Sequence, residues 1–351
     1  MTDKSPRTRG FLQRSMQAMR DGLVLSASDK RHLVLGTIGF ALAALLPFVS
    51  DGYALSVGIS IAMYAVLATS WMLFSGPTNY ISLGTAAFFG IGMYVVAGGI
   101  DLLPFSALVV IAALVGGVFA AIVGLATLRI AGVYFVIFTL GMAELIRQIT
   151  VWGQAKMGSQ AGLYVLVGMD DSTLYWLLIA LAAIVFLVGW WIGRSRLGFA
   201  LRIIGNDEVV AVHSGINTAR AKVVLFVISS VFASITGALV APRYSYVEPT
   251  LAFSPFISFQ VVIMALLGGV HRLWGPLVGV IPFTLMWEVI NASYPRLSTL
   301  LLGVCFLLIV YFIPHGVVGL IESLRGGYRK GGGPLRDLLQ NTLRNRKSNN
   351  A

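Results

Sequence analysis

A series of long apolar stretches, separated by short polar segments, most constrains how this chain can fold. We expect membrane spans at residues 32–50, 54–74, 81–100, 104–128, 132–150, 173–193, 221–241, 257–270, 275–291 and 298–315. Several approach the roughly 20 residues that a helix needs to cross a bilayer. Because 57% of the residues are hydrophobic and only 11% are charged, the apolar surface exceeds what one soluble core buries. The sequence therefore predicts an all-α, polytopic membrane helical bundle of about eight to ten transmembrane helices.

Two stretches predict broken or re-entrant segments within this bundle. Residues 257–270 are short for a span, and residues 76–90 contain Gly76, Pro77, Asn79, Ser82 and Gly84. A membrane tolerates such interruptions only where protein or a water-filled path covers the backbone. Small residues spaced four apart predict that helices approach closely elsewhere; they are Gly116, Ala120 and Gly124, then Ala86 and Gly90, then Gly275 and Gly279.

The basic residues gather in three blocks beside apolar spans. Of 25 Lys and Arg, seven lie in residues 1–31, five in 194–222 and seven in 325–347. Ten spans with a cytoplasmic N-terminus put 21 of them inside and three outside, which is the bias typical of cytoplasmic loops. The net charge of +11 therefore indicates membrane orientation rather than binding to nucleic acid.

This orientation divides the chain into three parts. Residues 1–31 form a cytoplasmic basic segment, either a helix lying on the membrane or a disordered tail. Residues 32–320 form the transmembrane domain, with a cytoplasmic loop at 194–222 and an external loop at 151–172. Residues 321–351 form a cytoplasmic basic tail. Both termini of this multi-pass protein are expected on the cytoplasmic side.

The sequence motifs of common enzymes are missing from the chain. It contains no G-x-x-x-x-G-K-[ST] phosphate loop, no H-E-x-x-H and no G-x-S-x-G. Its four histidines have no metal-ligand spacing, and its single cysteine, Cys305, allows no internal disulfide. We expect neither an enzyme nor a metal or cofactor site in this chain.

The loop at 194–222 contains residues that typically begin and end a helix. Asn206 can cap a short helix that has Asp207 and Glu208 in its first turn, and Gly215 can end that helix in the left-handed C′ position. A tether between two spans needs no such caps, although the five basic residues alone would fit an anchor. We interpret the loop as a docking platform for another protein.

Charged and polar residues inside the spans give the candidates for a solute path. Glu144 and Arg147 lie one helical turn apart, near the outer end of the fifth expected span. They form either a self-neutralising pair that stabilises the bundle or the mouth of a path. Likewise, Asn79, Ser82 and Gly84 belong either to a path or to the irregular start of a close-packed helix.

A second glycine-rich run predicts a tight internal turn between two spans. It reads GGVHRLWGPLVG, and its turn or gate residues are Gly268, Gly269, Trp274, Gly275, Pro276 and Gly279.

Three motifs, in this order along the chain, resemble those of the LivM-type permeases of branched-chain amino acid ABC importers. They are NYISLGTAAFFGIGMY, SRLGFALRIIGNDEVVAVHSGIN and LGGVHRLWGPLVG, which together spread over residues 76–290. The resemblance implies a permease subunit of the bacterial inner membrane that carries branched-chain or related amino acids. Its implied partners are a second, LivH-like permease, two cytoplasmic ABC ATPases and a periplasmic solute-binding protein, with ATP and Mg²⁺ acting in the ATPases.

The same resemblance implies a coupling helix in the central loop that contacts an ATPase. The matching positions are Glu208, Ala211 and Gly215, with Val209 and Val210 where the family often has alanine; the coupling residues are then Arg202, Asn206, Asp207, Glu208, Ala211 and Gly215. Two alternatives remain: a permease for urea, short amides or another small polar solute, and a self-sufficient secondary transporter. The latter predicts activity without an ATPase.

Overall fold

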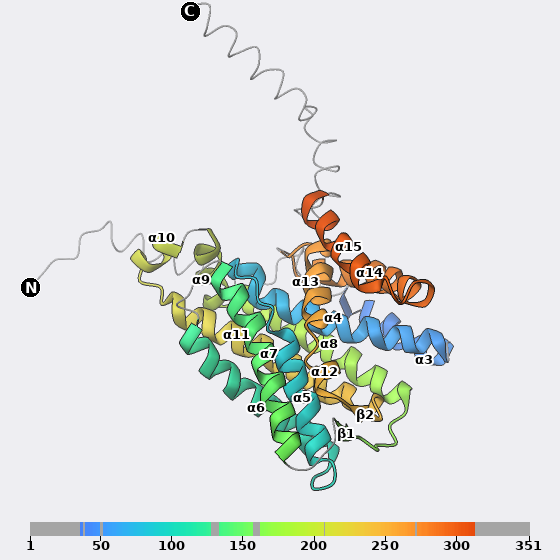
Figure 1. The fold of residues 1–351 in the computed structure, drawn as a ribbon. Coiled ribbons are helices and arrows are strands. Elements are labelled where there is room, and N and C mark those ends of the chain that lie inside the picture. The colour runs from blue at the N-terminus through green and yellow to red at the C-terminus, as the bar shows by residue number, and fades with distance from the viewer. Residues whose placement is uncertain are drawn as a thin grey trace, which may run out of the picture.

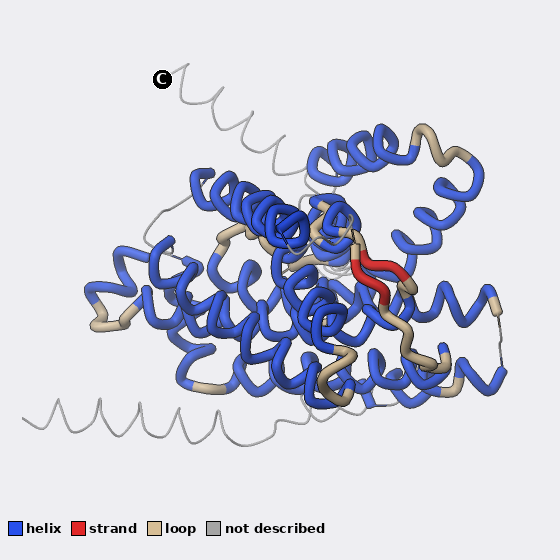
Figure 2. Tube along the Cα trace, turned by 60° about the horizontal axis from the view of Figure 1, so that its bottom comes forward, coloured by secondary structure: helices blue, strands red, loops and turns tan. Residues whose placement is uncertain are grey.

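A computed structural model describes residues 36–37, 39–49, 52–127, 133–156, 162–206, 208–270 and 272–312. The expected N-terminal segment 1–31 and tail 321–351 lie outside these residues. Within the described residues nearly every element is a helix, as Figures 1 and 2 show. The helices are α3 (Leu46–Val49), α4 (Tyr53–Thr78), α5 (Thr85–Gly99), α6 (Phe105–Thr127), α7 (Val133–Lys156), α8 (Asp171–Arg194), α9 (Arg196–Asn206), α10 (Glu208–His213), α11 (Thr218–Val240), η1 (Ala241–Arg243), α12 (Pro249–Ala252), α13 (Pro255–Gly268), α14 (Gly275–Ser293) and α15 (Ser298–Phe312).

The predicted all-α membrane bundle is confirmed. Among the described residues, seven helices are long and apolar enough to cross a membrane; they span Tyr53–Thr78, Phe105–Thr127, Val133–Lys156, Asp171–Arg194, Thr218–Arg243, Pro249–Gly268 and Gly275–Ser293. Three shorter apolar helices cover Gly39–Val49, Thr85–Gly99 and Thr299–Leu308. Each of the ten expected spans therefore has an apolar helix in the structure.

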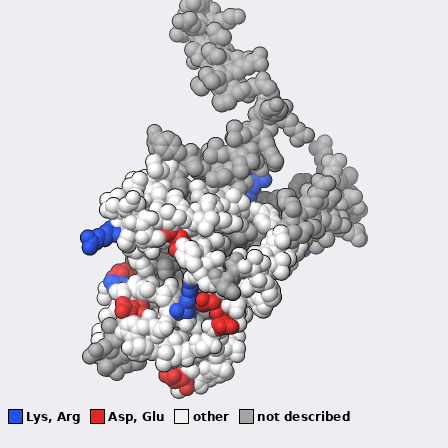
Figure 3. Space-filling model, turned by 90° about the vertical axis from the view of Figure 1, so that its right-hand side faces the viewer, with Lys and Arg blue, Asp and Glu red and all other residues white. Residues whose placement is uncertain are grey.

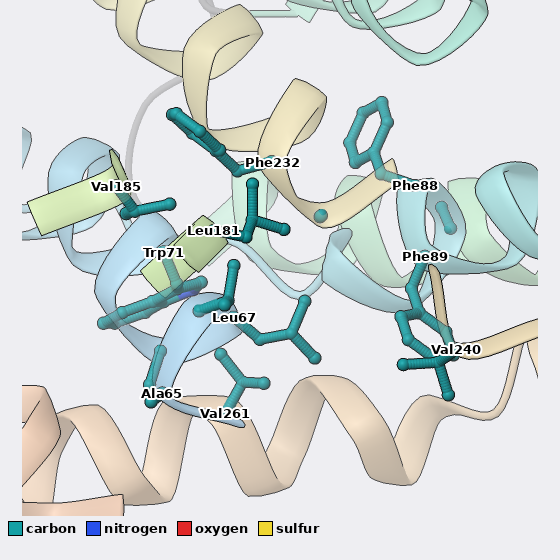
Figure 4. Packing of buried hydrophobic residues seen from close by; sticks show 14 of the residues in the cluster. Ala65, Leu67, Trp71, Phe88, Phe89, Leu181, Val185, Phe232, Val240 and Val261 are labelled. Atoms are coloured by element: carbon teal, nitrogen blue, oxygen red, sulfur yellow. The ribbon is translucent and has the colours of Figure 1, made fainter. Parts of the chain in front are cut away.

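Helix α4 forms the centre of the bundle. In its most apolar window 78% of the residues are buried, against 22% for α7, the least buried of the seven long helices. Leu67 and Trp71 of α4 point into a core to which α8, α11 and α13 contribute, as Figure 4 shows. Ala65, Leu67 and Trp71 lie there beside Val185, Phe232 and Val261. Because most of α4 is covered by its own chain, it offers less surface to lipid or a partner than the other long helices.

Glycines bring several helices into backbone contact. A Cβ at Gly92 of α5 would lie 1.9 Å from the carbonyl oxygen of Ser234 in α11, and one at Gly237 would lie 1.9 Å from that of Phe89. The predicted small-residue stripe of α6 faces the same helix, since a Cβ at Gly116 would meet the Ser234 hydroxyl. Small residues thus allow α5, α6 and α11 to pack more closely than larger side chains permit.

Two ends of the bundle can be distinguished. Helices α9 and α10 lie at one end, which we call the α10 end, and the strands β1 (Leu163–Tyr164) and β2 (Tyr246–Val247) lie towards the other (Figure 1). The strands pair antiparallel, with Leu163 opposite Val247 and Tyr164 opposite Tyr246. They join the connection before α8 to the connection after α11. Viewed from the right-hand side of Figure 1, the surface is mostly uncharged, with a few acidic and basic side chains (Figure 3).

Candidate functional site

The Glu144–Arg147 pair lies near the middle of α7 rather than near its end. The helix continues to Lys156, six residues beyond the expected end of the span at residue 150. Arg147 donates from Nε to Glu144 Oε2 at 2.8 Å and from Nη2 to Oε1 at 2.5 Å. Gln148 donates to the same Oε1 at 2.8 Å. The carboxylate is therefore held by a two-pronged guanidinium contact and an amide, the strong form of an ion pair.

This pair faces away from the core of its own chain. Helix α7 buries Phe135, Thr139 and Met142 on one face. The Glu144 side chain is 46% exposed and that of Arg147 23%, and exposed apolar residues such as Ile137, Leu145 and Ile149 share the outward side. A charged pair on the surface of a membrane span is costly where it meets hydrocarbon. The outward face of α7 therefore calls for another protein surface or a water-filled path.

A second functional region begins where α4 ends. Pro77 lies in the last turn of the helix, Thr78 Oγ1 donates back to the Phe74 carbonyl at 2.6 Å, and Asn79 takes a left-handed conformation with φ of 57°. Proline removes a backbone donor and crowds the turn before it, and asparagine tolerates the left-handed region, so these residues end the helix. The Asn79 side-chain amide donates to the Gly205 carbonyl of α9 at 2.9 Å.

Residues 79–84, which we call the unwound segment, connect α4 to α5 without helical structure. Side chains from three helices replace the missing helical hydrogen bonds. Trp71 Nε1 of α4 donates to the Ser82 carbonyl at 2.7 Å, and Leu83 N donates to Thr139 Oγ1 of α7 at 3.0 Å. Ser258 Oγ of α13 donates to the Leu83 carbonyl at 2.8 Å and accepts from Ala86 N at 2.9 Å. The predicted broken segment is thus present, with its backbone covered by protein.

The structure separates the two groups of expected path residues along α7. Ser82 and Gly84 are buried, and a Cβ at Gly84 would meet Met142 and Thr139 on the inward face of α7. Glu144 and Arg147 lie further along the same helix and turn outward. Asn79 instead borders an open cavity of about 650 Å³ at the α10 end, with Gly76, Gly189 and Arg194 also in its wall. Helix α7 is therefore the element that connects the unwound segment to the charged pair.

Asn206, the expected cap, is instead the last residue of α9, and helix α10 forms the short helix expected in this loop. It begins at Glu208, and Gly215 has φ of 78°. Ile216 N donates to the Ala211 carbonyl at 3.1 Å and Gly215 N to the Val212 carbonyl at 3.0 Å, the paired bonds of a Schellman motif. Ala211 is buried beneath this turn, whereas Val210 and Val212 are about half exposed. Asp207 and the side chains of Arg202, Asn206 and Val209 lie outside the described residues.

Lys222, the fifth residue of α11, joins α10 to the unwound segment. Its side chain is only 1% exposed. Its Nζ donates to Glu208 Oε1 at 2.5 Å and to Tyr80 OH at 2.9 Å, and lies 4.1 Å from the centre of the Tyr80 ring. Tyr80 OH in turn donates to Glu208 Oε2 at 3.4 Å. A buried ammonium is thereby neutralised by the first residue of α10.

The glycine-rich run at 268–279 forms the turn between α13 and α14. Gly268 ends α13, Gly269 follows with φ of 110°, and α14 starts at Gly275 after Trp274, with Pro276 in its first turn. A Cβ at Gly279 would lie 2.1 Å from the Met264 carbonyl oxygen, so the two helices touch through their backbones. Trp274 packs on Phe186 of α8 with ring centres 4.3 Å apart. In the described part of the chain, no cluster of His, Cys, Asp or Glu could hold a metal ion.

Comparisons with known proteins match this chain to transport permeases. A family model described as "Branched-chain amino acid transport system / permease component" matches residues 53–310. The chain is 24% identical to the high-affinity branched-chain amino acid transport system permease protein LivM of Salmonella typhimurium over 83% of this chain and 76% of that protein. It is 28% identical to the LivH permease protein of Escherichia coli over 41% of this chain and 46% of that protein. It is also 28% identical to the ribose import permease protein RbsC of Haemophilus influenzae over 31% and 35%, respectively.

Proposed function

Because this chain belongs to the branched-chain amino acid transport permease family, we propose that it forms one half of an importer's path through the bacterial inner membrane. A second, LivH-like permease subunit forms the other half. A periplasmic solute-binding protein delivers branched-chain amino acids, and two cytoplasmic ATPases use ATP and Mg²⁺ to drive their passage. This chain itself catalyses no reaction. Its similarity to both LivM and LivH, two different permease proteins, supports such a pair.

The charge distribution supports a cytoplasmic position for the α10 end. Counted over the sequence, 21 Lys and Arg fall on that side of the ten spans and three on the other. Exposed Arg196 and Arg220 flank α9, α10 and the start of α11 there. The paired strands β1 and β2 then belong to the periplasmic rim, where a binding protein approaches.

The outward-facing ion pair of α7 is the observation that carries the proposal. A charged pair within a span is stable only beside protein or water, and the outward face of α7 also carries exposed apolar residues such as Ile137, Leu145 and Ile149. A second permease packed along α7 supplies the protein, and the path between the two subunits supplies the water. The zwitterionic head of an amino acid carries one charge of each sign, which Glu144 and Arg147 complement.

The exposed valines of α10 fit the docking of an ATPase. Val210 and Val212 present apolar side chains at an end of the bundle where the neighbouring arginines lie in water. Exposed apolar groups rimmed by polar ones are typical of protein contacts. The Schellman turn and the contact with Lys222 fix helix α10 to the bundle. A displacement of α10 by the ATPase would therefore also displace the helices that it contacts.

Replacing Val210 by aspartate is expected to release the ATPase. Val210 is the third residue of α10, where an acidic side chain suits the helix, so the fold is retained while a charge enters the apolar contact. The measurement is the amount of ATPase that co-purifies with the tagged permease. Val210→Ala, which keeps the surface apolar, is the matched control and should retain the ATPase; equal retention by both variants would contradict docking at this helix.

The solute and the energy source are tested with the complex purified from its own membranes. The partners that co-purify are identified, and the complex is reconstituted in vesicles loaded with ATP on the ATPase side. We expect uptake of labelled leucine, isoleucine and valine that depends on ATP and on the binding protein. Uptake without ATP would favour the secondary transporter, and uptake of urea, short amides or ribose instead would move the proposal to another solute. The ribose relative motivates including that sugar.

A further inference from the structure

The buried ammonium of Lys222 is unusual among the charged groups of the α10 end. Cytoplasmic loops and span ends commonly place lysine where its head group reaches water. Here the side chain is 1% exposed, and its contacts are Glu208 and Tyr80, which come from two different parts of the chain. Glu208 begins α10, whereas Tyr80 belongs to the unwound segment after α4. One buried charge therefore ties the docking helix to the interruption in the bundle.

A second contact joins the same two regions. The Asn79 side-chain amide donates to the Gly205 carbonyl at 2.9 Å, and a Cβ at Gly205 would lie 2.6 Å from the Pro77 carbonyl. The last turn of α9 therefore rests directly on the end of α4. Asn79 and Tyr80 are neighbours in sequence, and Gly205 and Glu208 lie three residues apart. The two contacts therefore hold α9, α10 and the beginning of the unwound segment as one unit.

Tyr80 extends this connection to α7. Its ring packs edge-on against Phe135, with ring centres 5.5 Å apart, and Phe135 is fully buried on the inward face of α7. The next turn of α7 carries Thr139, whose hydroxyl accepts the Leu83 N–H of the unwound segment. A chain of contacts thus runs from Tyr80 to the helix that bears Glu144 and Arg147.

We propose that Lys222 and Tyr80 are positioning residues that convert displacement of α10 into rearrangement of the unwound segment and α7. The proposal rests on the proposed function, because it needs an ATPase that moves α10. The unwound segment suits this role, since its backbone is held by the side chains of Trp71, Thr139 and Ser258 rather than by a helical ladder. Such bonds can be exchanged in a discrete step without unfolding a helix.

The decisive measurement follows the unwound segment directly. Spin labels are placed at Ile81, which is 43% exposed, and at Leu166, which is 83% exposed towards the β1–β2 end, in a Cys305→Ser background. The distance between the labels is measured by electron–electron resonance in the complete complex, with and without a non-hydrolysable ATP analogue. We expect the distance distribution to change in the otherwise unaltered complex and to stay unchanged when Lys222 is replaced by methionine.

The chosen substitutions keep the bundle intact. Methionine fills the space of the lysine stem and removes the buried charge, and it leaves the half-exposed Glu208 carboxylate in contact with water. Tyr80→Phe keeps the ring on Phe135 and removes only the hydroxyl, so it decides the matter should Lys222→Met fail to assemble. Lys156→Met is the matched control, because Lys156 is exposed and touches only the Trp152 ring among its described contacts.

Transport provides the second readout. With Lys222→Met we expect leucine uptake to fall about tenfold while ATP hydrolysis stays within about twofold, since coupling rather than catalysis is lost. Leucine uptake with Tyr80→Phe should lie between that of Lys222→Met and that of the unaltered complex. Uptake with Lys156→Met should equal that of the unaltered complex. Normal distance changes and normal uptake in both Lys222→Met and Tyr80→Phe would overturn the link. If the unaltered complex itself showed no response to ATP, the proposed function would fail instead.

Discussion

Leucine uptake by the reconstituted complex is expected to fall about a hundredfold when Glu144 is replaced by glutamine. The substitution leaves the Arg147 guanidinium without its carboxylate near the middle of α7. An unpaired arginine inside a membrane span costs up to about 3 kcal/mol, and each 1.36 kcal/mol corresponds to about a factor of ten. Uptake and the yield of assembled complex are both measured. The control is Glu248→Gln at the N-cap of α12, which removes a carboxylate outside the spans. Its uptake and its yield of assembled complex should equal those of the unaltered complex.

A charge swap separates the two interpretations of this pair. In the double variant Glu144→Arg with Arg147→Glu, the ion pair is retained with its direction reversed. We expect the yield of assembled complex to recover. We expect uptake to remain low, because the zwitterionic amino acid then meets the positive and negative side chains in reversed order. Recovery of uptake together with assembly would show that the pair only neutralises itself within the bundle.

Replacing Gly237 by alanine is expected to be among the most damaging single changes to stability. The added methyl would lie 1.9 Å from the Phe89 carbonyl oxygen, and this oxygen is fixed in the backbone of α5. Relief requires α5 and α11 to separate, so we expect destabilisation at the upper end of the about 1–3 kcal/mol typical of overpacked cores. The measurement is the thermal unfolding midpoint of the purified chain in detergent, followed by intrinsic tryptophan fluorescence.

Two further variants are compared with Gly237→Ala, one expected to be neutral and one expected to add to the damage. Gly303→Ala places its methyl in open space on α15 and should leave the midpoint unchanged. Gly92→Ala presses on the Ser234 carbonyl from the other side of the same contact, and combined with Gly237→Ala it should prevent recovery of folded protein. An unchanged midpoint in Gly237→Ala would mean that α5 and α11 pack less closely than the backbone distances require.

The apolar pattern predicted the spans well because hydrocarbon selects strongly for it. All ten expected stretches contain an apolar helix, and the interruption at Pro77 and Asn79 lies inside the range that their residue types marked. Helix ends were less accurate. Helix α7 continues through Gln148 and Gln154 to Lys156, since polar residues end a hydrophobic window without ending the helical hydrogen-bond ladder.

The tertiary contacts of the site could not be read from the sequence. Lys222 counted as one basic residue of a cytoplasmic loop, and nothing in its neighbourhood indicated that its ammonium is buried against Tyr80. Tyr80 itself lies within a recognised motif, but its role depends on Glu208, 128 residues away. Thr139 and Ser258 read as ordinary small polar residues of two spans. Their importance arises only when the bundle brings them to the unwound segment.

The hydrogen bonds of the unwound segment also constrain how the protein is made. The segment and the short α5 that follows emerge from the ribosome well before Ser258, which lies 175 residues beyond the Leu83 carbonyl that it satisfies. Until α13 is synthesised, the Leu83 carbonyl and the Ala86 amide lack the partner that they have in the finished bundle. We therefore expect nascent chains to pass through a stage in which this stretch depends on the insertion machinery or on interfacial water. The hydrogen bonds of this stretch can be completed only after α13 has been inserted.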